Sequence, residues 1–144
     1  MRDAASRIER IEGVRIVGRS RVYETAPVGG PPQPDFLNGA LLVECTLSLP
    51  ALLEELLRIE VSVGRVRGPG EIRFGPRTLD LDVLWAEGVI LDDPRITVPH
   101  PRLAGRAFAL MPLLDVAPEA TDPRTGEPYV VVDAAGVRVT SSTW

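Results

Sequence analysis

Residues 73–83 read R-F-G-P-R-T-L-D-L-D-V and bring arginine, glycine, proline and two aspartates together in one short stretch. From residue 79 onward apolar and acidic residues alternate, which predicts a strand with leucine and valine on the core face and Asp80 and Asp82 on the other. Two acidic residues so placed have Cβ atoms very roughly 6 to 7 Å apart, and their carboxylates repel each other unless a cation is near. Magnesium binds one or two carboxylates and completes its octahedron with water and phosphate oxygens. The pattern therefore predicts a magnesium site.

Arginines precede these carboxylates among several glycines and prolines, at positions 65, 67, 73 and 77. All 16 residues of the Lys+Arg total are arginine, and a chain without lysine cannot form a Walker-type phosphate loop. Guanidinium groups bind phosphate through paired hydrogen bonds and stay charged at any working pH. Metal-binding carboxylates beside phosphate-binding arginines predict nucleotide phosphate chemistry.

The composition is that of an ordinary globular chain of one domain, with 144 residues, 44% hydrophobic and 25% charged. A net charge of −4 argues against a general nucleic-acid or membrane-surface binder. A nucleic-acid-binding module is therefore a weak hypothesis for this chain. Cys45 is the only cysteine, which excludes a disulfide framework and a thiolate metal site. The sequence has no apolar run of about 18 residues and no secretory leader, so we expect a cytoplasmic protein.

Hydrophobic periodicity and glycine or proline signals divide the remaining sequence into short elements. Helices are expected at residues 2–12, 48–63 and 103–114, the last ended or kinked by Pro112. Strands are expected within 14–25 and at 40–47, 95–98 and 129–133, with a hairpin or tight return at 85–93. A proline-rich loop is expected at 27–35.

Four polar residues stay ambiguous when their own stretches are read alone. Asn38 is either a turn residue before a strand or a ligand group. Glu60 faces solvent or reaches a ligand, and helical spacing favours solvent. His100 is held rigidly between two prolines, yet a lone histidine is more often structural than catalytic. Arg106 either extends to water or points at an anion.

Four motifs in order resemble the family of 6-hydroxymethyl-7,8-dihydropterin pyrophosphokinase, an enzyme of folate biosynthesis. They are E-T-A-P-V-G (24–29), D-F-L-N (35–38), F-G-P-R-T-L-D-L-D-V (74–83) and V-P-H-P-x-x-x-x-R-x-F (98–108). The resemblance runs from about Arg2 to Glu119. It implies an α+β, ferredoxin-like α/β sandwich, in which helices pack on a mainly antiparallel sheet, as a single domain over residues 1–144. The family's first strand and Gly-Ser-Asn loop would precede Met1, so the domain is expected to be incomplete at its N-terminus.

The resemblance also implies a reaction: an ATP- and magnesium-dependent transfer of pyrophosphate to the hydroxymethyl group of the dihydropterin, releasing AMP. The alternative is a truncated, non-catalytic relic that still binds nucleotide or pterin. The implied partners are these small molecules, without nucleic acid or membrane, and the implied state is a monomer.

Carried over position by position, the resemblance assigns roles to individual residues. The catalytic group would be Arg65, Arg77, Asp80 and Asp82, with Asp80 and Asp82 holding two magnesium ions. The nucleotide would contact Glu60, Arg67, Arg95, Thr97, His100 and Arg106. The pterin would contact Thr25, Val28, Phe36, Asn38 and Phe108, with the two phenylalanines stacking on its faces and Asn38 meeting its polar edge.

Overall fold

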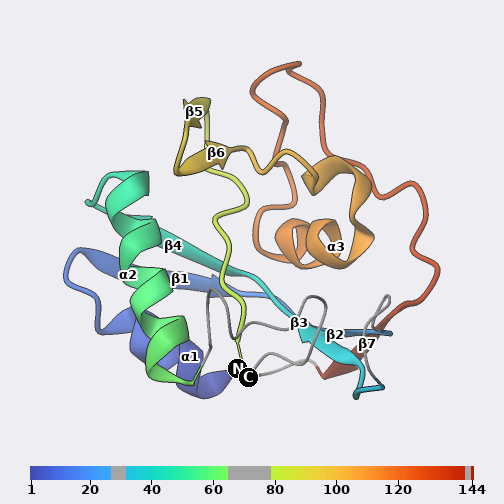
Figure 1. Ribbon diagram of the computed structural model, residues 1–144. Coiled ribbons are helices and arrows are strands. Elements are labelled where there is room, and N and C mark those ends of the chain that lie inside the picture. Colours follow the sequence, from blue (N-terminus) through green and yellow to red (C-terminus); the bar gives the residue numbers. More distant parts are fainter. Residues whose placement is uncertain (27–31, 65–78, 142–143) are drawn as a thin grey trace.

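The computed structural model describes residues 1–26, 32–64, 79–141 and 144, and it shows an α+β fold (Figure 1). The helical elements are α1 (Arg2–Glu9), α2 (Leu49–Ser62), the 3-10 turn η1 (Leu103–Gly105) and α3 (Ala107–Val116). The strands are β1 (Val14–Arg19), β2 (Val22–Thr25), β3 (Phe36–Asn38), β4 (Leu41–Cys45), β5 (Leu91–Asp93), β6 (Ile96–Val98) and β7 (Val137–Ser141). Every described strand pair is antiparallel, which confirms the predicted fold class. Within these residues, no helix is both long and apolar enough to cross a membrane.

The strands form three small sheets, with orders β1-β4, β3-β2-β7 and β5-β6. In Figure 1, α1 and α2 lie on one side of the β1–β4 pair and α3 lies on the other. Each side has its own apolar cluster. The first joins α1, β1 and α2 through Ile8, Val14, Leu52, Leu56 and Ile59. The second surrounds α3 and contains Leu103, Leu110, Leu113, Ala120 and Tyr129.

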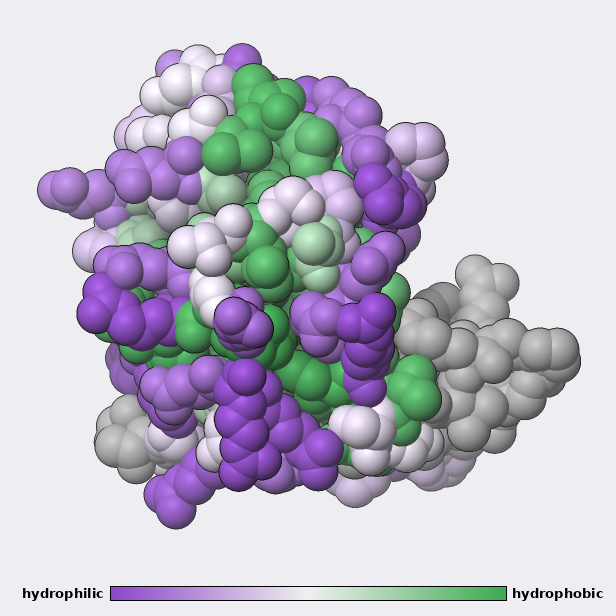
Figure 2. Space-filling view, turned by 90° about the vertical axis from the view of Figure 1, so that its left-hand side faces the viewer, coloured by the Kyte–Doolittle hydropathy of each residue, from purple (hydrophilic) through white to green (hydrophobic). Residues whose placement is uncertain are grey.

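Helix α2 forms where the sequence predicts it. The Ser48 hydroxyl accepts a hydrogen bond from the Ala51 N–H at 3.3 Å, Pro50 lies in the first turn, and Gly64 follows with a φ of +95°. The side of the molecule on which α2 lies in Figure 1 has apolar residues through its middle and hydrophilic residues around them (Figure 2). Helix α2 therefore forms one wall of the molecule, with one face in the core and the other exposed.

Residues 79–83 do not form the predicted strand, although their side chains alternate as predicted. Leu79, Leu81 and Val83 are half-buried against the α1–α2 core, while Asp80 and Asp82 are exposed. A strand requires backbone hydrogen bonds to a neighbouring strand, and none is assigned to this stretch among the described residues. The Leu81 N–H instead donates to the Glu60 carboxylate at 2.6 Å. The strand assignment was therefore wrong, and the predicted separation of faces was right.

The C-terminal edge strand was predicted too early, at 129–133. Tyr129 is buried beside α3 and its N–H donates to the Ala120 carbonyl at 3.1 Å, whereas the Val132 side chain is 93% exposed. This stretch therefore anchors into the α3 cluster instead of pairing with a sheet. After a turn at Gly136, where φ is +78°, β7 forms the edge strand beside β2.

Helix α3 starts at Ala107, later than predicted, because residues 103–105 form the separate turn η1. Pro112 lies inside α3 and does not end it, since the helix continues to Val116. In the preceding part of the chain, the predicted return at 85–93 is a turn around Gly88 that leads into the β5–β6 hairpin.

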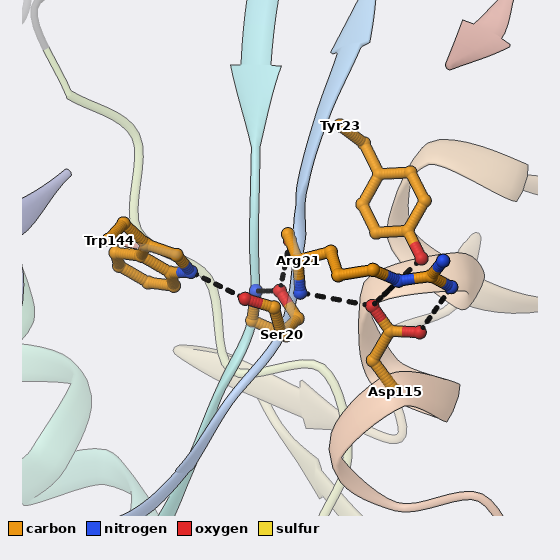
Figure 3. Close-up of polar contacts among 6 residues, drawn as sticks. Ser20, Arg21, Tyr23, Asp115 and Trp144 are labelled. Carbon is orange, nitrogen blue, oxygen red and sulfur yellow. Dashed lines mark hydrogen bonds and ion pairs between the residues drawn. The ribbon is translucent and has the colours of Figure 1, made fainter. Parts of the chain in front are cut away.

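A polar clasp fixes the end of α3 against the beginning of β2 (Figure 3). The Asp115 carboxylate accepts hydrogen bonds from the Arg21 N–H, Nε and Nη2 at 3.0, 3.1 and 2.9 Å and from the Tyr23 hydroxyl at 2.8 Å. Burial by itself raises the pKa of Asp115, but these donors outweigh it and the net pKa is lowered. Nearby, the Trp144 indole donates to the Ser20 carbonyl at 2.6 Å.

Candidate active site

A cleft of about 420 Å³ opens between α2, residues 80–82 and the segment that leads into α3. Six of the residues predicted to bind nucleotide or metal line it: Glu60, Asp80, Asp82, Arg95, His100 and Arg106. Its remaining wall is formed by Leu53, Leu57, Leu81 and Arg102. Acidic groups and cationic groups from distant parts of the sequence therefore share one cleft.

Asp80 and Asp82 form the acidic side of this cleft. Although Asp82 keeps access to solvent, desolvation by the surrounding cleft walls raises its pKa, and repulsion from Asp80 raises it further; His100 and Arg106 act in the opposite direction without reversing the shift. A divalent cation would relieve this repulsion. Among the described residues, no group of three or more histidine, cysteine or acidic side chains could enclose a metal. Two carboxylates in an open cleft fit magnesium, which keeps several waters and binds phosphate oxygens.

Glu60 departs from the expectation that helical spacing gave, because it is fully buried and does not face solvent. It lies one helical turn after Leu56, on the face of α2 that packs into the core. Its carboxylate accepts the Leu81 N–H at 2.6 Å, and Leu81 separates the two aspartates. Glu60 therefore lines the cleft from its buried side and fixes the backbone between Asp80 and Asp82.

His100 is fixed in the cleft through its backbone and its ring. Its N–H donates to the Leu84 carbonyl at 2.8 Å, and its Nδ1 accepts the Arg102 N–H at 3.2 Å. With Nδ1 acting as an acceptor, the neutral imidazole carries its proton on Nε2. This nitrogen is thus a hydrogen-bond donor suited to a phosphate oxygen.

The remaining predicted nucleotide residues differ in their placement. Arg106 lines the cleft, and its guanidinium lies 5.5 Å from the centroid of the Phe108 ring. Arg95 also lines the cleft, and its Nε makes an ion pair with Asp93 at 3.1 Å, which lowers the pKa of Asp93 through hydrogen bonding. Thr97 lies on β6 and is not among the residues that line the cleft.

The described residues that were predicted to contact the pterin lie outside this cleft, on β2, β3 and the first turn of α3. The Asn38 side-chain amide donates to the Thr25 hydroxyl at 3.1 Å across β2 and β3. The side chains of Phe36 and Phe108 are 38% and 37% exposed, which is high for aromatic rings. Phe108 contacts Arg106, a residue of the cleft, so at least this one of the predicted pterin residues adjoins the cleft.

A sequence model of the 7,8-dihydro-6-hydroxymethylpterin-pyrophosphokinase (HPPK) family matches residues 1–118. The chain belongs to the HPPK family. Three similar proteins are each named 2-amino-4-hydroxy-6-hydroxymethyldihydropteridine pyrophosphokinase. That of Synechocystis sp. is 38% identical over 90% of this chain and 65% of its own length. Those of Methylorubrum extorquens and Pseudomonas aeruginosa are 42% and 43% identical over 81% of this chain and 72% and 70% of their own lengths. The chain thus spans just under two thirds of the Synechocystis relative.

Four site residues carried over from the HPPK resemblance lie outside the described residues: Val28, Arg65, Arg67 and Arg77. Their roles, like those of the described site residues, stay predictions. Arg102 is a cleft residue that the sequence did not single out, although its position two residues after His100, directly after the V-P-H-P motif, was an available signal. Leu53 and Leu57 of α2 were not predicted as site residues either, and the structure places both on the cleft wall.

Proposed function

We propose that this HPPK-family chain transfers pyrophosphate from ATP to the hydroxymethyl group of 6-hydroxymethyl-7,8-dihydropterin, forming AMP and the pterin diphosphate for tetrahydrofolate biosynthesis. The observation that carries the proposal is the cleft in which Asp80 and Asp82 share one space with Arg95, His100 and Arg106. This combination suits a metal-bound triphosphate. We further propose that residues 1–144 act as one cytoplasmic domain, as a monomer, on these small molecules.

The main obstacle to the reaction is charge. A triphosphate carries about four negative charges, which repel an incoming oxygen nucleophile until they are neutralised. Asp80 and Asp82 would hold magnesium, which supplies this neutralisation when it is bound. Arg95, Arg102 and Arg106 would bind phosphate oxygens, and the Nε2–H of His100 would donate to another. Catalysis then consists mainly of positioning and electrostatic stabilisation.

The pterin would be held beside the triphosphate by the exposed aromatic rings. Phe36 and Phe108 would stack on its two faces, while the Asn38 amide, anchored by Thr25, would meet its polar edge. The hydroxymethyl oxygen would then form a bond to the β-phosphorus of ATP as the bond to the α,β-bridging oxygen breaks and AMP leaves. Arg106, which touches both groups of residues, would align the two substrates.

The direct test incubates the purified protein with ATP, Mg²⁺ and hydroxymethyl-dihydropterin and follows nucleotides by ion-exchange chromatography. We expect AMP to appear in equal amount to the pterin diphosphate, and neither to appear when pterin is omitted or EDTA is added. Formation of ADP would contradict pyrophosphoryl transfer. The non-catalytic alternative predicts a ligand-induced rise in melting temperature without AMP; the family match and the named pyrophosphokinases do not favour it.

A further inference from the structure

Strand β7 lies beyond the residues that the HPPK family model matches, yet it joins the sheet that carries the predicted pterin residues. It pairs with β2 through Glu24↔Arg138 and Thr25↔Val137. On its other edge, β2 pairs with β3 through Thr25↔Phe36 and Tyr23↔Asn38. The middle strand of this sheet is thus held between β7 and the strand that carries Phe36 and Asn38.

One side chain of β7 spans the sheet. The Arg138 Nη2 lies 3.3 Å from Glu24 Oε2 on β2 and 3.0 Å from Asp35 Oδ2, directly before β3. The two carboxylate side chains are only 27% and 31% exposed, so water solvates them incompletely. A single guanidinium therefore joins two acidic groups that would otherwise repel each other.

Arg138 acts from the face opposite the pterin residues. Paired residues in an antiparallel sheet share a face, and successive residues alternate between faces. Arg138, Glu24 and Leu37 consequently lie on one face, while Thr25, Phe36 and Asn38 lie on the other. Arg138 cannot contact a ligand held by those residues, so any effect on such a ligand must pass through the backbone of the sheet.

We infer that Arg138 is a positioning residue for the pterin: by pulling Glu24 and Asp35 together, it sets the spacing between β2 and β3 and thereby the separation of Thr25, Phe36 and Asn38. This inference rests on the proposed function, since it assigns the pterin to this sheet. It extends that function to a strand outside the family match.

The test compares Arg138→Met with the wild type in steady-state kinetics, varying pterin at saturating ATP and ATP at saturating pterin. The pterin KM should rise by about 3- to 10-fold, which is the scale of two partly exposed ion pairs lost together, while the ATP KM stays within about twofold. Arg138→Lys keeps the positive charge and loses the two-pronged guanidinium, so its pterin KM should lie between those of the wild type and Arg138→Met. Adding Asp35→Asn to Arg138→Met removes the repulsion and should recover part of the pterin affinity.

The matched control is Arg15→Met, which breaks the exposed cross-strand ion pair between Arg15 and Glu44 in the β1–β4 sheet. It should leave both KM values unchanged. Raising the salt concentration should increase the pterin KM of the wild type more than that of Arg138→Met, because salt screens the pairs that the variant already lacks. A pterin KM within twofold of the wild type, or an equal rise of both KM values, would overturn the inference.

Failure of the proposed function gives a different result. A wild-type protein that makes no AMP contradicts the reaction, and pterin binding measured by fluorescence with a non-hydrolysable ATP analogue still decides the role of Arg138. Weaker pterin binding by Arg138→Met than by Arg15→Met would support positioning. Equal binding by both would refute it.

Discussion

Replacing Asp115 with alanine tests how strongly the clasp holds α3 to β2. The carboxylate accepts four hydrogen bonds, and its loss leaves the hydroxyl of the fully buried Tyr23 without its acceptor. An unsatisfied buried donor costs about 1–3 kcal/mol. Arg21 is half exposed and regains water, so its lost bonds matter less. Alanine favours the helix and removes a negative charge from its C-terminal turn, which offsets about 0.5–1 kcal/mol.

We therefore expect the free energy of unfolding to fall by about 1–2 kcal/mol, measured by urea titration of tryptophan fluorescence at pH 7. In a double-mutant cycle, Tyr23→Phe should remove most of the cost of Asp115→Ala, because no buried hydroxyl is left unpaired. The folded-state pKa of Asp115 is lowered, so the clasp stabilises the protein above the ordinary value of 3.8 and is lost as the pH falls through the lowered pKa. A change under 0.5 kcal/mol at pH 7, or additivity in the cycle, would refute this reasoning.

Substitutions at three further positions test the site. Asp82→Asn should lower AMP formation at least about 100-fold. Desolvation in the cleft and repulsion from Asp80 raise the pKa of Asp82, so its ionised form destabilises the folded protein above pH 3.8. In EDTA, Asp82→Asn should therefore have a higher melting temperature than the wild type. A lower melting temperature would contradict the raised pKa. Asn38→Ala should raise the pterin KM about 10- to 100-fold and spare the ATP KM, and an equal rise in both would make Asn38 structural. Glu60→Gln still accepts the Leu81 N–H and should keep most of the activity. Glu60→Leu cannot accept it and should lower kcat about 10- to 100-fold with an unchanged circular dichroism spectrum. Equal kcat values for the two variants would exclude positioning by Glu60.

The sequence predicts best where the signal is local. Helix α2 follows from the Ser48 cap, the proline in its first turn and the spacing of its leucines, all within one segment. Strand β4 follows from a mainly apolar run that Glu44 alone interrupts. Residues of a dense motif, such as Asp80, Asp82 and His100, were also singled out from the sequence because several constrained residues occur together, and all three line the cleft.

The misses have a common physical cause, which is a partner distant in the sequence. The spacing of Glu60 from Leu56 was an available signal for its burial, but nothing near Glu60 in the sequence indicates that it accepts the amide of Leu81. Tyr129 looked like part of a strand because its neighbours are β-branched, but its packing against α3 decides its structure. Nothing in the sequence around Arg138 indicates a partner, and only the register of β7 with β2 brings it to Glu24 and Asp35.

Residues 79–83 show both cases within a single stretch: a property that the local sequence determines and one that depends on a distant partner. Alternating burial requires only that one face be apolar and the other polar, and the five residues carry that property themselves. Strand pairing requires a second backbone, which the five residues do not specify. Here the Leu81 amide is satisfied by the Glu60 side chain, so its hydrogen bond is made without a ladder while Asp80 and Asp82 still face the cleft. The chemistry of this stretch depends on the side chains that its alternation exposes, which is why its predicted site did not depend on the predicted strand.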